Sequence, residues 1–199
     1  MTLKKIYKKW ACVALTGASM LGATIATANA QQVFRNTITG EELKILEVAP
    51  KEGRDTPAVK SFLETGINPY VGVKGCLPRG EEAYLVACSG CHGHVGEGKV
   101  GPGLNDNYWT YPKNTTDKGL FETIFGGAQG MMGPHGGDLQ LDEVLALIAW
   151  IRHLNIGEAK DAEWLTDAQK ASFKPFNAKE WDGSGKAAAA KEQCTIPAN

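Results

Sequence analysis

The sequence predicts a mainly α-helical fold, and three stretches carry this prediction. The strongest is residues 141–154, where apolar side chains recur every three or four positions: Leu141, Val144, Leu145, Ile148 and Ile151. Residues 80–88 place two acids in a first helical turn, which the helix dipole favours. Residues 118–125 follow Asp117, a residue type that caps helices, and end before Gly126. We therefore expect helices to form the body of the protein.

The chain before residue 80 is less regular. Residues 33–45 hold β-branched side chains around a Thr-Gly pair and predict a short hairpin. Residues 58–65 predict a helix, because Thr56 suits the N-cap position and Pro57 the first helical position. Segments rich in Gly, Pro and Asn are expected to be loops: 67–79, 93–112 and 126–138.

The first 30 residues have the pattern of a secretory signal peptide. A start with four lysines precedes an uncharged, largely apolar run over residues 10–28, and Ala28-Asn29-Ala30 matches a cleavage site. The alternative is a membrane anchor, but Gly, Ser and Thr dilute the run. We expect cleavage after Ala30, export to the periplasm and no membrane anchor in the mature chain.

Cleavage would change the charge balance. The 199 residues include 21 basic and 22 acidic side chains, and four of the basic ones precede residue 31. The remaining 169 residues, enough for one domain with a core, carry 17 basic and 22 acidic side chains, a formal charge of −5. This mildly acidic balance argues against nucleic acid or anionic lipid as a partner.

The segment Cys88-Ser89-Gly90-Cys91-His92 is the chemical centre of the sequence. It matches Cys-x-x-Cys-His, the attachment motif of a covalent c-type haem. Two thiols at this spacing face one porphyrin edge and add to its vinyl groups, while the histidine reaches the iron as proximal ligand. The alternatives are a redox cysteine pair or half of a zinc site, but the chain has no thioredoxin-like context and no second ligand pair. We predict one covalent haem c.

Two further cysteines remain after export. Cys76 and Cys194 suggest a disulfide, because exported proteins fold in an oxidising compartment; the alternative is two free thiols. The bond would close a loop of about 118 residues, for which the chain-entropy model assigns roughly 4–5 kcal/mol.

Residues 80–154 resemble a class I cytochrome c in the order of their motifs. In that family the first and last helices cross at a glycine with aromatic residues beside it, and the matching residues are Gly80, Tyr84 and Trp150. The resemblance also implies that the carbonyl of Pro102 holds the proximal imidazole. We therefore divide the mature chain into an N-terminal extension, a cytochrome c core and a C-terminal extension wrapped on that core: residues 31–79, 80–156 and 157–199.

Four flanking stretches narrow the resemblance to the cytochrome c-L family. They are residues 34–37, 53–57, 105–112 and 130–135. Cytochromes of this family take electrons from the quinone-dependent methanol dehydrogenase of methylotrophic bacteria. The resemblance therefore implies a PQQ-dependent methanol or alcohol dehydrogenase as electron donor, and another soluble cytochrome c or a terminal oxidase as acceptor.

The same resemblance places the sixth iron ligand in the loop 131–135. The family motif Met-Pro-x-x-Gly-Gly aligns with residues 132–137 and favours Met132. His135 and Met131 are the alternatives, and the choice matters because a thioether raises the reduction potential relative to a second imidazole. The remaining histidines, His94 and His153, are expected at the surface.

The aromatic stretch 108–111 is expected beside the haem. Trp109, Tyr108 and Tyr111 would exclude water and bond to the propionates; alternatively, they fill a core of their own loop. The neighbouring residues 105–107 (Asn-Asp-Asn) offer oxygen ligands for Ca²⁺, which some cytochrome c-L proteins are thought to hold, although a full EF-hand loop is absent.

The sequence favours electron transfer over catalysis, because a closed His/Met site leaves no iron position open to a substrate. Two alternatives stay open. One is a gas sensor or peroxidase with a labile sixth ligand, and the other is a general periplasmic carrier without a dedicated dehydrogenase.

Overall fold

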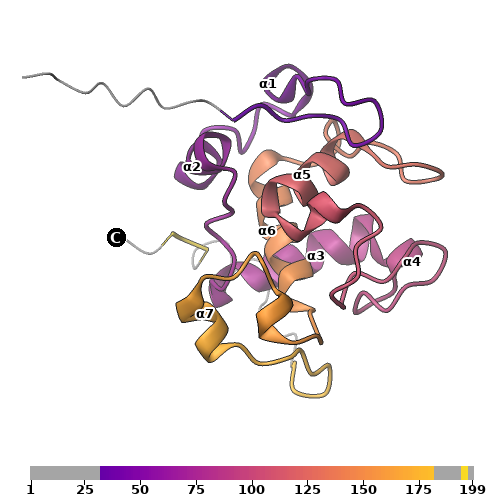
Figure 1. Cartoon of the computed structure of the whole chain (residues 1–199). Coiled ribbons are helices and arrows are strands. Elements are labelled where there is room, and N and C mark those ends of the chain that lie inside the picture. The colour runs from indigo at the N-terminus through magenta and orange to yellow at the C-terminus, as the bar shows by residue number, and fades with distance from the viewer. Residues whose placement is uncertain (1–31, 182–193, 197–199) are drawn as a thin grey trace, which may run out of the picture.

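The computed structural model describes residues 32–181 and 194–196 (Figure 1). The predicted signal peptide therefore lies outside the described residues. The elements, in chain order, are α1 (Ile45–Val48), α2 (Pro57–Thr65), η1 (Lys74–Cys76), α3 (Leu77–Ala87), α4 (Ser89–His92), η2 (Pro112–Thr115), α5 (Asp117–Gly126), α6 (Leu141–His153), η3 (Ala159–Asp161) and α7 (Asp167–Ser172). The prediction of a mainly α fold is confirmed. Within the described ranges, none of these helices has the length and apolar character needed to cross a membrane.

Helices α3 and α6 cross at the centre of the molecule (Figure 1). At the crossing, a Cβ atom on Gly80 would overlap the carbonyl oxygen of Ala146 and lie 2.9 Å from Cβ of Trp150. Only glycine allows the two backbones to approach this closely. Tyr84 and Trp150 pack beside the crossing with 0% and 1% of their surface exposed. The crossing therefore has the arrangement that the resemblance implied.

Three local predictions need correction. Helix α3 begins at Leu77 rather than at residue 80, because Pro78 suits the first turn of a helix. Helix α5 is capped by Thr116, whose side chain accepts a hydrogen bond from the backbone N–H of Gly119 at 3.0 Å, so Asp117 is its first residue and not its cap. The predicted hairpin over residues 33–45 is an isolated antiparallel bridge without regular strands.

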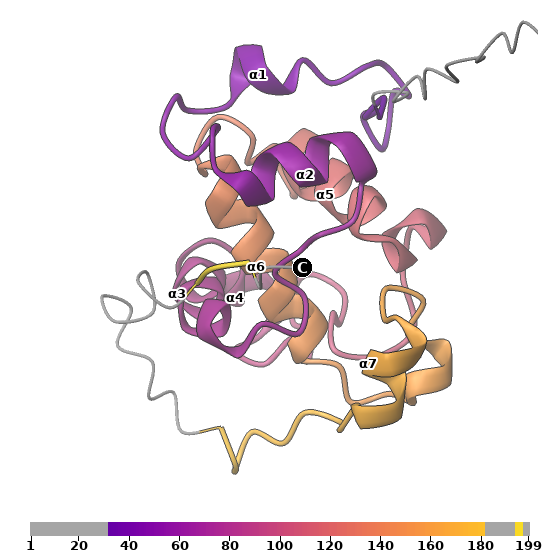
Figure 2. The same cartoon turned by 90° about the vertical axis from the view of Figure 1, so that its left-hand side faces the viewer.

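The N-terminal extension covers one end of the helical core, as Figure 2 shows for α1 and α2. Helix α2 has the predicted cap, since the Thr56 side chain accepts from the backbone N–H of Val59 at 3.2 Å. Three phenylalanines join this extension to α5. The ring centroids of Phe34, Phe62 and Phe121 lie between 4.9 and 5.5 Å apart.

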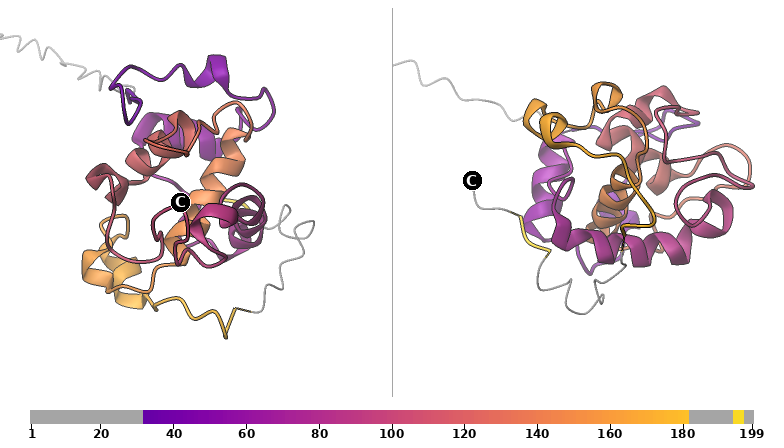
Figure 3. Two further views of the ribbon diagram at one scale, coloured as in Figure 1. Left: turned by 90° about the vertical axis from the view of Figure 1, so that its right-hand side faces the viewer. Right: turned by 90° about the horizontal axis from the view of Figure 1, so that it is seen from below.

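The C-terminal extension packs on α3 and α6 from the other side, and Figure 3 shows it in orange to yellow. The Trp181 ring centroid lies 5.0 Å from that of Trp150, and its indole N–H donates to Glu81 at 3.0 Å. His153 is half-buried in this aromatic cluster, 5.2 Å from Trp181, which corrects its expected surface position.

The predicted disulfide is present between Cys76 and Cys194, whose Cα atoms are 4.4 Å apart. It joins the end of the C-terminal extension to the residue immediately before α3. The extension is thus attached to α3 by a covalent bond and by the hydrogen bond between Trp181 and Glu81.

Candidate functional site

A cavity of about 500 Å³ lies between α4, the loop that follows it, α5 and the loop after α5. Both cysteines and the histidine of the Cys-x-x-Cys-His motif line this cavity, together with apolar side chains from several elements: Val100, Leu104, Leu120, Ile124 and Ile151. The motif and its surroundings therefore meet around one enclosed, largely apolar space.

The motif forms a single helical turn directly after α3. The backbone N–H groups of Cys91 and His92 both donate to the carbonyl of Cys88, at 3.1 and 2.9 Å. This turn brings Cys88, which is half-buried, and Cys91, which is exposed, to the same cavity. Both thiols thus reach one cavity, and their attachment to a single porphyrin edge stays a prediction.

His92 is oriented by a backbone carbonyl, as the resemblance implied. Its Nδ1 lies 2.8 Å from the carbonyl oxygen of Pro102, and the residue is 8% exposed. Because a carbonyl only accepts, Nδ1 carries the proton and Nε2 keeps a free lone pair, which is the tautomer that binds a metal. The ring also packs closely on Gly101, where a Cβ atom would lie 2.7 Å from Cε1 of His92.

The electrostatics of the cysteines disfavour the redox interpretation. Burial, and secondarily the neighbouring Cys91, raise the pKa of the Cys88 thiol to about 12. A redox Cys-x-x-Cys pair depends on a thiol whose pKa is lowered. A Cys88 thiol with a raised pKa beside a held imidazole suits haem attachment better than thiol exchange.

The opposite wall of the cavity contains two of the three candidate sixth ligands in a half-buried position. Met131, Met132 and His135 all line the cavity, but Met131 has 80% of its surface exposed, whereas Met132 and His135 are half-buried. The loop is attached to α5 by hydrogen bonds from the backbone N–H of His135 to the Ile124 carbonyl at 3.1 Å. The structure therefore brings Met132 and His135 to the same side, and the choice between them stays a prediction.

The aromatic stretch contributes two of its three predicted side chains. Trp109, 8% exposed, and Tyr111 line the cavity, and the Tyr111 hydroxyl accepts from the backbone N–H of Gln129 at 3.0 Å. Tyr108 is 72% exposed and does not line the cavity, so its expected place beside the haem stays a prediction without support from this geometry. The cause of this exposure is a tight turn in which Asp106 accepts from the backbone N–H of Tyr108 at 2.9 Å.

The residues predicted to bind calcium are engaged in other contacts. The Asn105 amide donates to the carbonyl of Val95 at 3.0 Å, and the Asn107 side-chain oxygen accepts from Asn155 at 3.1 Å. Across residues 32–181 and 194–196, no cluster of three or more His, Cys, Asp or Glu suits a metal ion. The calcium site stays a prediction without support from these contacts.

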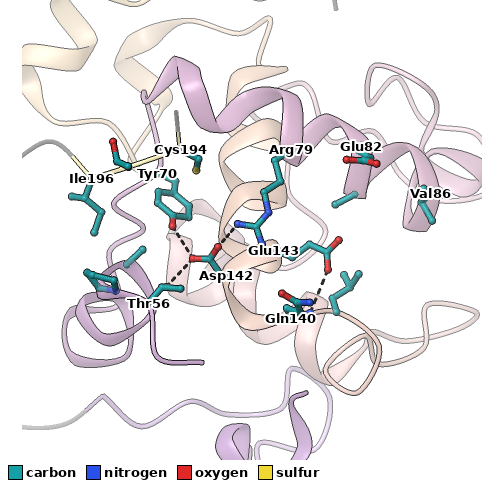
Figure 4. Close-up of a pocket in the computed structure, with 15 residues that line it drawn as sticks. Thr56, Tyr70, Arg79, Glu82, Val86, Gln140, Asp142, Glu143, Cys194 and Ile196 are labelled. Atoms are coloured by element: carbon teal, nitrogen blue, oxygen red, sulfur yellow. Dashed lines mark hydrogen bonds and ion pairs between the residues drawn. The ribbon is translucent and has the colours of Figure 1, made fainter. Parts of the chain in front are cut away.

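A second cavity, of about 810 Å³, lies at the N-terminal end of α6 (Figure 4). There, Asp142 accepts hydrogen bonds from the hydroxyls of Thr56 and Tyr70 at 2.8 and 2.7 Å and forms an ion pair with Arg79. These contacts join α2, the loop after it and α3 to α6. We interpret this network as a structural junction, because its polar groups bind one another.

Arg152 was not singled out in the sequence analysis. It is 3% exposed, and its Nε donates to Asp117 Oδ1 at 3.0 Å. The sequence did contain a signal for this ion pair. Arg152 stands near the end of a nearly all-apolar helix and Asp117 at the start of another, and such charged residues are candidates for a buried pair.

The cavity fits a covalently bound haem. Two thiols line it together with an imidazole whose Nδ1 is held by the Pro102 carbonyl, and apolar side chains form most of the wall. Crossed helices that meet at a glycine position this motif. Together, the fold and the site define a class I c-type cytochrome.

Comparisons with known proteins agree. A family model described as cytochrome C oxidase, cbb3-type, subunit III, matches residues 77–151. A relative from Methylorubrum extorquens named cytochrome c-L is 57% identical over 172 residues, which cover 80% of this chain and 87% of the relative. The chain belongs to the cytochrome c-L family.

Solved structures support the same assignment. The crystal structure of cytochrome cL from Hyphomicrobium denitrificans has 71% sequence identity and a TM-score of 0.77, covering 84% of this chain and 99% of that one. Cytochrome CL from Methylophaga aminisulfidivorans has 52% identity and a TM-score of 0.71, covering 75% of this chain and 99% of that one. The family carries haem c and transfers electrons.

Proposed function

We propose that this protein is a periplasmic electron carrier that accepts single electrons from a PQQ-dependent methanol or alcohol dehydrogenase. It passes them to another soluble cytochrome c or to a terminal oxidase. The observation that carries this proposal is the membership in the cytochrome c-L family, combined with a cavity lined by His92 of the Cys-x-x-Cys-His motif and by the candidate sixth ligands Met132 and His135. Haem bound there supplies the Fe(III)/Fe(II) couple.

Each residue then has a defined task. Cys88 and Cys91 hold the haem through thioether bonds, and Pro102 keeps the His92 imidazole in the orientation and tautomer that bind iron. Met132 is the proposed sixth ligand, with His135 as the alternative. With both axial positions filled from the protein, the iron exchanges electrons and performs no chemistry on a small molecule.

The mouth of the cavity is the proposed docking surface. Val100 and Met131 line the cavity and are also 68% and 80% exposed, so apolar side chains stand in solvent beside the haem position. Neither residue carries a charge. Electron-transfer partners form small and transient contacts, which a compact apolar rim of this kind can supply.

Stopped-flow reduction of the haem-loaded protein by methanol dehydrogenase tests the donor. We expect reduction at least tenfold faster than that of an unrelated class I cytochrome c of similar potential. Val100→Asp should slow the reaction without changing the absorption spectrum. The matched control is Ile67→Asp, since Ile67 is 67% exposed but does not line the cavity. A wild-type rate equal to that of the unrelated cytochrome would refute the dedicated donor and favour a general carrier.

Carbon monoxide separates electron transfer from the sensor or peroxidase alternative. With a closed site, the absorption spectrum of the reduced protein stays unchanged when the gas is added. Rapid carbon monoxide binding by the reduced wild-type protein would contradict the electron-carrier proposal, because it would reveal a labile sixth position.

A further inference from the structure

Arg152 is a buried cation directly behind one wall of the haem cavity. Its guanidinium carbon lies 5.1 Å from the ring centroid of Trp109 and 4.2 Å from that of Trp164. Trp109 itself lines the cavity. The guanidinium therefore contacts an indole that lines the cavity without lining the cavity itself, at distances typical of cation–π contacts.

The charge of this guanidinium is only partly compensated. Nε donates to Asp117 at 3.0 Å and Nη2 donates to the carbonyl of Asn114 at 2.8 Å. Nη1 is buried and has no acceptor among the described residues. The indole N–H groups of Trp109 and Trp164 are likewise buried and without an acceptor there. Burial lowers the pKa of Arg152 and raises that of Asp117, while the opposite charge of each partner counteracts the shift.

The ion pair has a direction relative to the cavity. Two partners of the guanidinium, Trp109 and Asn114, line the cavity, although Arg152 itself does not. Asp117 does not line it either, and neither does its other partner, Asn68. The positive end of the pair thus lies toward the haem position, and the negative end lies away from it. A buried pair with this orientation produces a net positive potential in the cavity, because the nearer charge dominates in a medium of low polarity.

Stability alone does not account for such a pair. Replacing a buried ion pair by apolar side chains of similar volume is often neutral or stabilising. The pair does, however, have an electrostatic consequence for a group that gains an electron, because positive charge favours the reduced state.

We propose that Arg152 is a positioning residue of the haem site, which holds Trp109 against the cavity and raises the reduction potential by keeping a positive charge behind it. The proposal rests on the haem-carrying part of the proposed function. It does not depend on which dehydrogenase is the donor.

Equilibrium redox titration of haem-loaded variants with chemical mediators tests this proposal. Arg152→Gln should lower the midpoint potential by an amount corresponding to roughly a tenfold change in the ratio of Fe(II) to Fe(III), about 59 mV for one electron. Asp117→Asn should shift the potential in the opposite direction, because it leaves the guanidinium uncompensated. Arg152→Lys keeps the charge but not the planar contact, so it should change the near-ultraviolet circular dichroism of the tryptophans more than the potential.

Arg79→Gln is the matched control. Arg79 also forms an ion pair with an aspartate, Asp142 of α6, but this partner does not line the haem cavity, whereas Trp109 and Asn114 beside Arg152 do. It should lower stability and leave the potential unchanged. Equal potentials in wild type, Arg152→Gln and Asp117→Asn would overturn the proposal, as would equal shifts in Arg152→Gln and Arg79→Gln. If Arg152→Gln fails to fold, Asp117→Asn tests the proposal by itself. A potential above that of the wild type supports the proposal, and an equal or lower potential overturns it. Because mediators replace the dehydrogenase, failure of the donor proposal leaves this result intact.

Discussion

On the proximal side of the haem cavity the chain is held by buried hydrogen bonds, whereas the distal side is an exposed loop. The His92 imidazole is bonded to Pro102, and the Tyr84 hydroxyl donates to the Gly93 carbonyl at 2.8 Å inside the core. Across the cavity, Met131 is 80% exposed, and a Cβ atom on Gly137 would meet nothing within 4 Å.

This difference indicates how one protein can combine a rigid attachment with an adaptable ligand. The proximal turn must hold two thioether bonds and one imidazole in a single geometry, so several contacts determine it. The distal loop needs only to deliver one side chain to the iron, and two candidates three residues apart reach the same wall. Four predictions test this contrast, from the largest expected effect to the smallest.

Replacing both Cys88 and Cys91 by Ala should abolish covalent haem attachment, because no thiol remains to add to the vinyl groups. Haem staining after denaturing electrophoresis measures the result. Met132→Ala is the distal counterpart and should keep its haem bound under the same conditions. Covalent haem in the double cysteine variant would contradict the assignment of the motif.

Met132→Ala should lower the reduction potential by roughly 0.1 V or more, because axial ligand identity sets haem potentials over about 0.8 V. It should also remove the weak near-infrared band of sulfur-to-iron ligation in the oxidised protein. His135→Ala should retain both properties. The opposite pattern, in which only His135→Ala changes the spectrum, would identify His135 as the sixth ligand.

Gly101→Ala should destabilise the protein by about 1–3 kcal/mol, because the added methyl group would overlap the His92 ring. The distal control is Gly137→Ala, where the space is open, and a change within about 0.5 kcal/mol is expected. Chemical denaturation of both variants gives the two free energies of unfolding. Equal losses would mean that the two sides are similarly constrained.

Tyr84→Phe should cost about 1 kcal/mol, because it leaves the buried carbonyl of Gly93 without its donor. On the distal loop, the backbone N–H of Gln129 donates to the Tyr111 hydroxyl in an exposed position. Tyr111→Phe removes this acceptor, and water can take its place. We expect that variant to unfold at nearly the wild-type denaturant concentration. A larger loss for Tyr111→Phe would show that the distal loop depends on this bond.

Much of the fold followed from local patterns. The apolar periodicity of residues 141–154 and the cap at Thr56 correspond to α6 and α2. The N-cap of α5 was harder to predict, because two candidate residues are adjacent. Thr116 occupies the position that was expected for Asp117. The Asp117 carboxylate instead accepts a hydrogen bond from Arg152, which lies 35 residues further along the chain.

Within the site, the aromatic stretch 108–111 also shows that local sequence patterns do not report contacts between distant segments. Tyr108 and Trp109 are adjacent and equally able to border a haem by residue type. A turn closed by Asp106 directs one to solvent, and packing against Arg152 holds the other at the cavity. The burial of each ring depends on elements distant in the chain, which local periodicity does not report.

The sequence by itself predicted the covalent chemistry of this protein. Five consecutive residues match the motif for haem attachment and a proximal ligand, because the spacing of thiols and imidazole within one helical turn is a local property. Only the tertiary structure decided which candidate side chains line the same cavity as the motif: Met132 with His135, and Trp109 without Tyr108. It also placed Arg152 against the Trp109 ring. Those positions arise where α6 packs beside α5 and its preceding turn, and packing between segments distant in sequence sets them.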